Sequence, residues 1–229
     1  QSLNMSSEDA PDSFRKLCAV EYALAKHVDR HGMPGEDESF SYSFGASPRP
    51  TFEEPSIVDL YYRRGREALK SSIKLLYEQQ DVSKKELATA VAELADWYVA
   101  FDKYQYANEH YQLAYQLLGE SEDSAALQAA FFSEPRLITF MTDADSGVNA
   151  GLTGDEQFQV TFDISERGVP GNLRMADRTE ELGVRQVKKI RKEVLGFRFR
   201  PPLKDGVFMA TPDYVYSYPV KTEVEEHES

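Results

Sequence analysis

The sequence predicts an α+β protein in which helical hairpins precede a small β-β-α-β module. Apolar side chains in residues 94–118 recur every three or four positions, which is the spacing of a buried helix face. Residues 157–164 instead alternate strictly between apolar and polar side chains, as a half-buried strand does. The expected parts are a helical region over 1–131, a linker over 132–156 that begins by packing and ends exposed, the module over 157–220 and a disordered acidic tail over 221–229.

The composition excludes several classes of partner. The 229 residues carry a net charge of −13, and 41% of them are hydrophobic, which is enough to build a core. A surface this acidic argues against non-specific binding of nucleic acid and against docking on an anionic membrane. No signal-peptide pattern is visible, and no run of about 18 apolar residues exists, so we expect no membrane span in this chain.

The sequence offers no pattern that carries catalysis or metal binding. Cys18 is the single cysteine, so no internal disulfide is possible, and we interpret it as a packing residue. The histidines show no paired ligand spacing; they are His27, His31, His110 and His227. There is no Gly-rich phosphate loop and no nucleophile elbow. We therefore expect no catalytic residue, no metal and no cofactor, and a protein that is not an enzyme.

The helical region begins with a helix over residues 13–31. Residues 32–55 are rich in proline, glycine and aromatic side chains, which predicts an irregular insert. This insert is either an ordered flap, which we favour, or a flexible excursion. A long helix over residues 56–80 opens at Ser56. Its apolar positions recur at helical spacing, at Leu60, Leu69, Ile73, Leu76 and Tyr77.

Residues 94–118, LADWYVAFDKYQYANEHYQLAYQLL, carry two apolar faces. The faces consist of Leu94, Ala95 and Tyr98, and of Ala107, Tyr111 and Ala114. The FDKYQY segment between them is too short for a separate loop, so we expect two helices that fold back as a hairpin. The small side chains of Ala95 and Ala107 let the two backbones approach closely.

This pattern resembles the tetratricopeptide repeat, which combines a large–small pair, an aromatic residue and a later Ala-x3-aromatic-x2-Ala. Cys18, Tyr22 and Ala25 repeat the second face, so residues 13–31 resemble the second helix of another repeat. Too few residues precede it to form the first helix of that repeat. We therefore expect the chain to begin in mid-repeat, as the C-terminal part of a longer protein. The pattern departs from the family at Asp102, where the repeat usually turns on glycine.

The module begins with the strand QFQVTFDI, the turn SERG and a second strand, GNLRMA, which together predict a hairpin. A helix capped by Asp177 or Thr179 follows. Its apolar stripe consists of Val184, Val187, Ile190 and Val194. The last strand, DYVYSYPV, has a proline at each end, which suits an edge strand.

This order, with the sequence FRFRP after the helix, resembles the C-terminal domain of TonB, the bacterial energy transducer. The residues that carry the resemblance are QFQVTFDISERGVPGNLRMA, RQVKKIRKEVLGFRFRP, Gly206 and the closing strand. In that family a receptor peptide adds as an extra strand beside the last strand of the sheet, and no residue is catalytic. The resemblance implies a periplasmic location and a partner-binding edge formed here by Tyr214, Val215, Tyr216, Ser217 and Tyr218.

Two further features have a functional and a plain interpretation. Asp96 and Val99 would line the concave groove of the repeat, where this family often holds peptides, or they pack on the module or on the missing repeats. The tyrosine stripe of the last strand would dock a peptide or pack on the helix, and in either case the backbone edge can still recruit a strand. The basic run from Arg185 to Lys204 would meet phosphates or an acidic protein, or it is a solvated face or pairs with the acidic helices of the first half.

The resulting hypothesis is a non-catalytic adaptor of the bacterial envelope that binds proteins through its helices and the edge of its sheet. The alternative is a structural or assembly protein whose repeats self-associate, with the module as a cap. An enzyme is the third hypothesis, which two carboxylates of raised pKa in a cleft would support.

Overall fold

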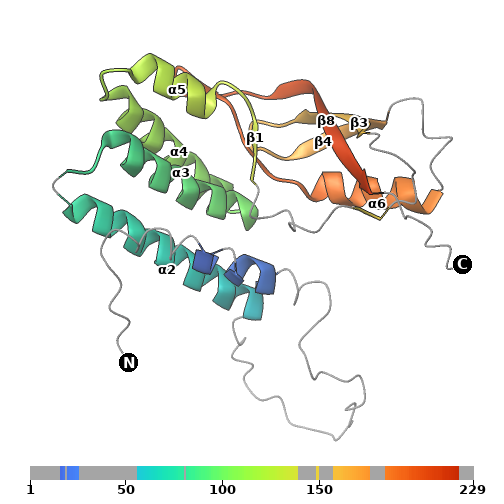
Figure 1. The fold of residues 1–229 in the computed structure, drawn as a ribbon, viewed down its shortest axis with the longest axis horizontal. Coiled ribbons are helices and arrows are strands. Elements are labelled where there is room, and N and C mark those ends of the chain that lie inside the picture. The colour runs from blue at the N-terminus through green and yellow to red at the C-terminus, as the bar shows by residue number, and fades with distance from the viewer. Residues whose placement is uncertain are drawn as a thin grey trace, which may run out of the picture. The chain divides into compact units, whose positions relative to one another are not determined.

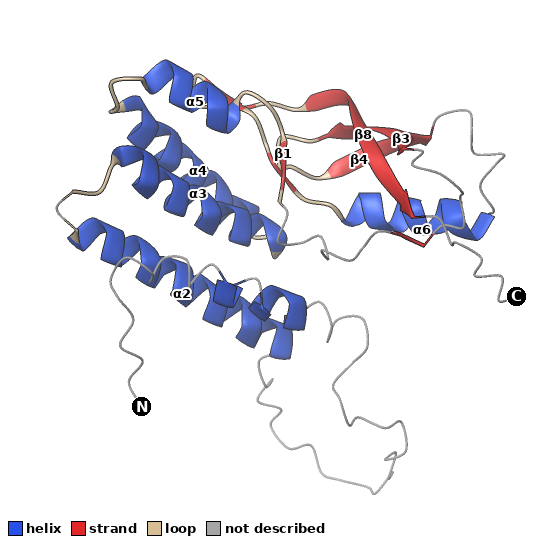
Figure 2. Cartoon of the chain, viewed as in Figure 1, coloured by secondary structure: helices blue, strands red, loops and turns tan. Residues whose placement is uncertain are grey.

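The structure is a computed structural model, and it contains two compact units, residues 1–80 and 81–229. It describes residues 16–18, 20–25, 56–79, 81–138, 148–149, 157–175 and 184–221. The predicted insert, the predicted helix caps Asp177 and Thr179, and the tail beyond Lys221 lie outside these residues. Helices and strands are both present, as the α+β prediction requires (Figure 2).

The first unit contains helix α2 (Ile57–Glu78), which begins where the sequence predicted it. Ser56 caps this helix by accepting a hydrogen bond from the Asp59 amide at 3.2 Å. Residues 16–18 and 20–25 are also helical, and their Cys18, Tyr22 and Ala25 side chains are buried. The Cys18 Sγ donates to the Gly65 carbonyl oxygen at 3.3 Å, so this cysteine packs against α2.

The apolar stripe predicted for α2 is only partly correct. Leu69 and Leu76 are buried, but Leu60 and Tyr77 are exposed. The rest of the buried face uses polar and small residues, namely Tyr62, Gly65, Ala68 and Ser72.

The second unit opens with three helices, α3 (Lys84–Ala100), α4 (Tyr104–Gly119) and α5 (Ser124–Phe132). A capping box at Ser83 and Glu86 starts α3. The predicted hairpin is confirmed, because α3 and α4 pack on each other through both predicted faces. All six residues of those faces are buried: Leu94, Ala95, Tyr98, Ala107, Tyr111 and Ala114.

The hairpin turns on Asp102, which adopts a φ of +57°. Its amide donates to the Val99 carbonyl, and the Lys103 amide donates to the Tyr98 carbonyl at 2.8 Å. These two bonds end the helix in the way that a glycine normally does. Asp102 tolerates the left-handed conformation, and its carboxylate accepts bonds from Tyr104 and from Arg198.

The remaining elements of the second unit are helix α6 and a set of strands, the longest of which form one sheet (Figure 1). They are β1 (Arg136–Leu137), β2 (Val148–Asn149), β3 (Gln157–Ile164), β4 (Pro170–Met175), α6 (Val184–Gly196), β5 (Phe199–Arg200), β6 (Leu203–Lys204), β7 (Val207–Phe208) and β8 (Thr211–Lys221). The main sheet has the order β2-β8-β3-β4, in which β3 pairs antiparallel with both β4 and β8. The predicted hairpin and closing strand are therefore confirmed.

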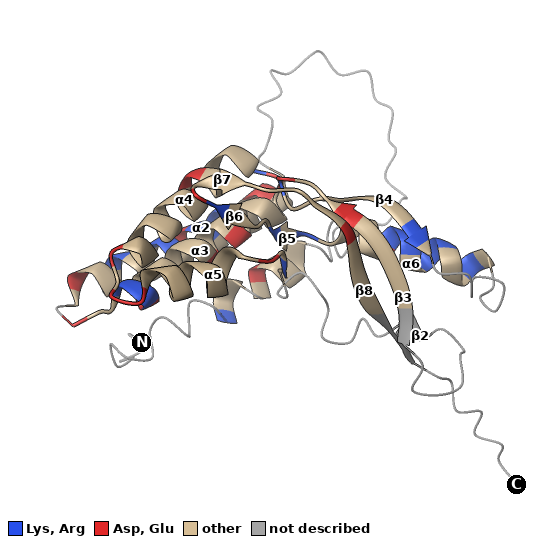
Figure 3. Cartoon of the chain, turned by 90° about the horizontal axis from the view of Figure 1, so that it is seen from above, with Lys and Arg blue, Asp and Glu red and all other residues tan. Residues whose placement is uncertain are grey.

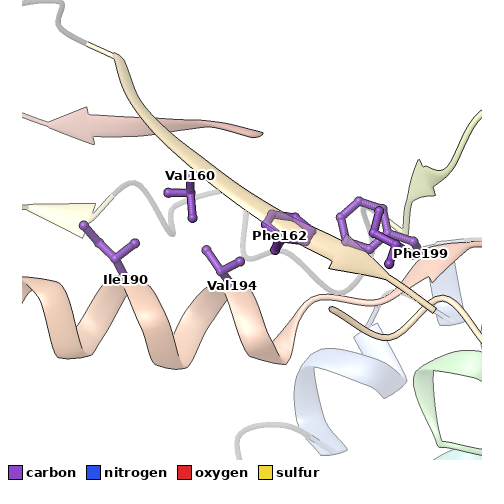
Figure 4. Packing of buried hydrophobic residues seen from close by; sticks show 6 residues of the cluster. Val160, Phe162, Ile190, Val194 and Phe199 are labelled. Carbon is purple, nitrogen blue, oxygen red and sulfur yellow. The ribbon is translucent and has the colours of Figure 1, made fainter. Parts of the chain in front are cut away.

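One face of this sheet packs on α6. Val160 and Phe162 of β3 point toward Ile190 and Val194 of α6, and Phe199 lies beside them (Figure 4). All of these side chains are fully buried. The predicted stripe of α6 is correct except at its start, because Val184 is 72% exposed.

Two small pairings were not predicted. Strand β1 pairs with β5, so the start of the predicted linker packs on the module, and Ile138 there is buried. Strands β6 and β7 form a hairpin whose turn residues, Asp205 and Gly206, both have positive φ. Asp-Gly suits this kind of two-residue turn.

The turn between β3 and β4 requires glycine at position 168. Gly168 has a φ of +75°, and a Cβ there would lie 1.8 Å from the Phe199 carbonyl oxygen. The Gly168 carbonyl also accepts the Phe199 amide at 2.9 Å, which ties the turn to β5. A side chain here would have to displace backbone rather than another side chain.

We predict that Gly168→Ala lowers the free energy of unfolding by about 2–4 kcal/mol, because the clash and the positive φ act together. Urea unfolding followed by the fluorescence of Trp97, the only tryptophan, measures this in the second unit. Gly171→Ala is the matched control, because a Cβ there meets no atom within 4 Å. Equal unfolding midpoints for the two variants would contradict the prediction.

Candidate interaction surfaces

The outer edge of β8 is the first candidate surface. Strand β8 pairs with β3 from Thr211 to Pro219. On its other side it meets β2 only at Val220 and Lys221. Among the described residues, therefore, no strand covers this edge of β8 between positions 211 and 219. Unpaired N–H and C=O groups on such an edge can accept a further strand.

The side chains of β8 divide between the two faces of the sheet. Tyr214 packs on Phe162 and Phe199, with ring centroids 5.5 and 5.4 Å away. Tyr216 packs on Phe197 at 5.2 Å. Burial raises the pKa of both tyrosines.

The residues between the tyrosines are exposed. Val215 is 53% exposed, and Ser217 is exposed as well. The side chain of Tyr218 lies outside the described part of the structure. The tyrosine stripe is therefore a packing face at positions 214 and 216, and a partner would meet Val215, Ser217 and the backbone edge.

The start of β8 is held by Asp163, at a bulge of β3. Its carboxylate accepts hydrogen bonds from the Asp213 amide at 3.0 Å and from the side chains of Asn172 and Arg174 at 2.8 Å each. Arg174 also forms an ion pair with Asp213 at 2.8 Å. The bond from Asn172 is the main cause that holds the pKa of Asp163 below its usual value, and the bond from the Asp213 amide adds to it. Asp213 itself has a φ of +51°, so this cluster fixes an unusual backbone turn.

Asp96 and Val99 do not line an open groove. Both are buried, and Asp96 accepts three hydrogen bonds inside the second unit. Arg200 donates through Nε at 3.1 Å and through Nη2 at 2.6 Å, and the Tyr111 hydroxyl donates at 2.6 Å. The groove interpretation of these two residues is therefore corrected: β5 of the module occupies the space beside Asp96.

The Asp96–Arg200 pair is surrounded by aromatic rings. The Arg200 guanidinium lies 5.8–5.9 Å from the ring centres of Tyr111, Phe131 and Phe132. Burial lowers the pKa of Arg200, but the attraction of Asp96 outweighs this effect, and the pKa is raised overall. Burial and then the Asp96 charge raise the pKa of Tyr111 well above its usual value. Asp96 and Arg200 are therefore held as an ion pair beside a neutral tyrosine.

A cavity of about 510 Å³ lies between α5 and the segment that leads into β8. Its apolar lining includes Ala125, Ala129, Phe132, Pro202, Leu203 and Met209. Lys204 and Asp205 place one charge of each sign in the same lining. The cavity could hold an apolar side chain, but its charges do not converge on any point as they would around a reacting group.

Sequence reasoning missed Arg200 and Asp163 as the residues that organise these surfaces. Arg200 belongs to the alternation FRFR, in which an exposed position is expected, yet it is buried. Asp163 lies on the polar face of β3, and nothing in its neighbourhood along the chain indicates its three hydrogen-bond donors. Both roles depend on partners distant in sequence, so a local pattern could not reveal them.

Within the ranges that the structure describes, no group of three His, Cys, Asp or Glu side chains could hold a metal ion. The same ranges contain no helix that is long and apolar enough to cross a membrane. No family model, no curated protein and no solved structure matches this chain.

We predict that Asp96→Leu lowers the free energy of unfolding by about 3–5 kcal/mol, because it leaves Arg200 buried without its counter-ion. The double variant Asp96→Leu with Arg200→Met removes both charges and should recover much of that loss. Urea unfolding of the parent, both single variants and the double variant completes the cycle. A double variant that loses the sum of the two single losses would show that the pair is not coupled.

We also predict an acid-dependent loss of stability that depends on Asp163. Its pKa in the folded protein lies below the usual 3.8, so the carboxylate stabilises the fold above about pH 4. That contribution is lost as the pH falls through the lowered pKa. Thermal unfolding between about pH 5 and pH 2.5 should show a smaller pH dependence for Asp163→Asn than for the parent. Identical pH profiles would contradict this role.

Proposed function

We propose that this chain is a non-catalytic adaptor of the bacterial envelope, which binds a protein segment along the outer edge of β8. The observation that carries the proposal is the uncovered stretch of this strand between positions 211 and 219 in the described structure. An added strand would gain main-chain hydrogen bonds, and it would contact Val215 and Ser217 through its side chains. The tyrosines behind them keep the strand fixed on the core.

The topology of the sheet supports the likeness to the TonB C-terminal domain. The chain order β3, β4, α6, β8 is the strand, strand, helix, strand order on which that likeness rests. Strand β8 is the counterpart of the strand beside which receptor peptides add in that family. A periplasmic location follows from the same likeness and is part of the proposal.

The helical hairpin supports the likeness to tetratricopeptide repeats. Ala95 and Ala107 are fully buried, and Asp102 makes the tight turn between the helices. Because Asp96 and Val99 are used internally, we assign any binding by these helices to the outward side of α4. That side exposes Tyr106 and Leu113.

One observation favours the alternative, a structural protein in which the module caps the helices. The buried pair of Asp96 on α3 and Arg200 on β5 joins the helices to the module within the second unit. A cap needs this kind of fixed attachment. It does not need an uncovered strand edge, and this difference separates the two functions experimentally.

We predict that Val215→Pro abolishes capture of an envelope protein if the β8 edge binds it, because proline removes one backbone donor. Neighbouring N–H groups point to opposite edges of a strand. A second variant is therefore needed in case the N–H of Val215 points toward β3. Val215→Lys with Ser217→Lys keeps every N–H and instead places two charges along the edge. Chemical crosslinking in a bacterial envelope extract, followed by pull-down, measures the capture.

Val207→Lys is the matched control, because Val207 is exposed to a similar extent as Val215, 61% against 53%, but lies on β7. Each variant is first checked by thermal unfolding. Loss of a captured protein in both edge variants and not in Val207→Lys supports the adaptor. Equal capture by all variants would move binding to the helices, and capture of nothing but further copies of the chain would favour the structural alternative.

A further inference from the structure

Helix α6 carries a cluster of basic residues, in a chain whose net charge is −13 (Figure 3). Its five basic residues are exposed: Arg185, Lys188, Lys189, Arg191 and Lys192. No ion pair joins any of them to another described residue. By contrast, Arg174, Arg198 and Arg200 each pair with a carboxylate. Among the described residues, therefore, no carboxylate lies within ion-pair distance of the basic side chains of α6.

The exposed face of α6 also carries apolar side chains. Val184 is 72% exposed and Leu195 is 37% exposed. Together with Lys188 and Arg191 they occur at positions i, i+4, i+7 and i+11, which form one line along a helix. Ile190 and Val194, on another side of the helix, anchor it in the core.

We propose that this face of α6 is a second docking site, which binds an acidic segment of a partner protein. Five positive charges on a helix about 20 Å long match a Glu- or Asp-rich segment of similar length. Val184 and Leu195 would contact apolar side chains near the two ends of that segment.

The charge of the whole chain selects a peptide over a larger polyanion. A membrane or a nucleic acid extends well beyond α6 and would approach the acidic remainder of the chain. Charges interact over about 8 Å at physiological salt, so that approach is repelled. A short acidic segment touches only the basic face and avoids this repulsion. The site is separate from the β8 edge and does not depend on the function proposed for it.

The test uses the full chain and a labelled, Glu-rich peptide of about a dozen residues with a leucine near each end. Fluorescence anisotropy at about 20 mM and about 150 mM salt measures the affinity. We expect Lys188→Glu with Arg191→Glu to weaken binding about tenfold or more at low salt, and the parent to bind more weakly at high salt. Lys70→Glu with Lys74→Glu on α2 makes the same change of charge at exposed positions and should change the affinity less than about twofold.

Three results would overturn the proposal. The first is an equal loss of peptide affinity in both double variants, which would show that only the net charge of the chain matters. The second is tighter binding to vesicles of phosphatidylcholine and phosphatidylglycerol than to the peptide. The third is binding of the peptide by a chain that ends at Lys221 but not by the full chain. That result would mean that the acidic residues after β8 are the natural occupant of this face. Retained binding in Val215→Pro would support a site independent of the strand edge.

Discussion

The second unit depends on the ion pair between Asp96 and Arg200. Arg200 follows Phe199, whose ring is part of the core between the sheet and α6, and it pairs with Arg136 of β1 through the backbone. Arg200 therefore connects α3, strand β1 at the start of the predicted linker, and the core under the sheet. Burying two charges costs about as much as their attraction returns, so such a pair adds little stability. Its effect is to specify one arrangement, because any other leaves a charge buried and unpaired.

The same constraint explains why the helices and the module form one compact unit rather than two. The sequence predicted a linker that begins by packing, and Ile138 is buried there, with its amide donating to the Arg198 carbonyl at 3.0 Å. Arg198 also reaches Asp102 in the turn of the helical hairpin, at 3.1 Å. Arg200, which is buried, and Arg198, which is largely covered, thus hold α3 and the turn that follows it beside β5. The boundary between the compact units falls instead at Gln80.

The sequence predicted those helices and strands that are determined by side chains close to one another along the chain. The two faces of residues 94–118 and the alternation of residues 157–164 each follow from side chains within one turn or one strand. Asp205-Gly206 is likewise a local signal, because Asp-Gly is typical of a two-residue hairpin turn. Of the two interpretations of Asp96, packing on the module holds, and local spacing could not have chosen between them. Its partner Arg200 is 104 positions away, and the expected groove is filled by a strand that helical spacing cannot reveal.

An edge strand that binds partners must resist both fraying and uncontrolled pairing. Tyr214 and Tyr216 oppose fraying, because their packing on the core fixes the strand. A strand that is already fixed would lose less entropy when a partner binds. The cluster around Asp163 opposes uncontrolled pairing. It holds Asp213 in a left-handed turn at the start of β8, and such a turn interrupts the flat edge that aggregating strands require. Since the cluster weakens only at acid pH, the edge stays limited in length under ordinary conditions. Under the proposed function, a partner strand would then be recognised over the few residues that follow Asp213, where Val215 and Ser217 would supply the contacts.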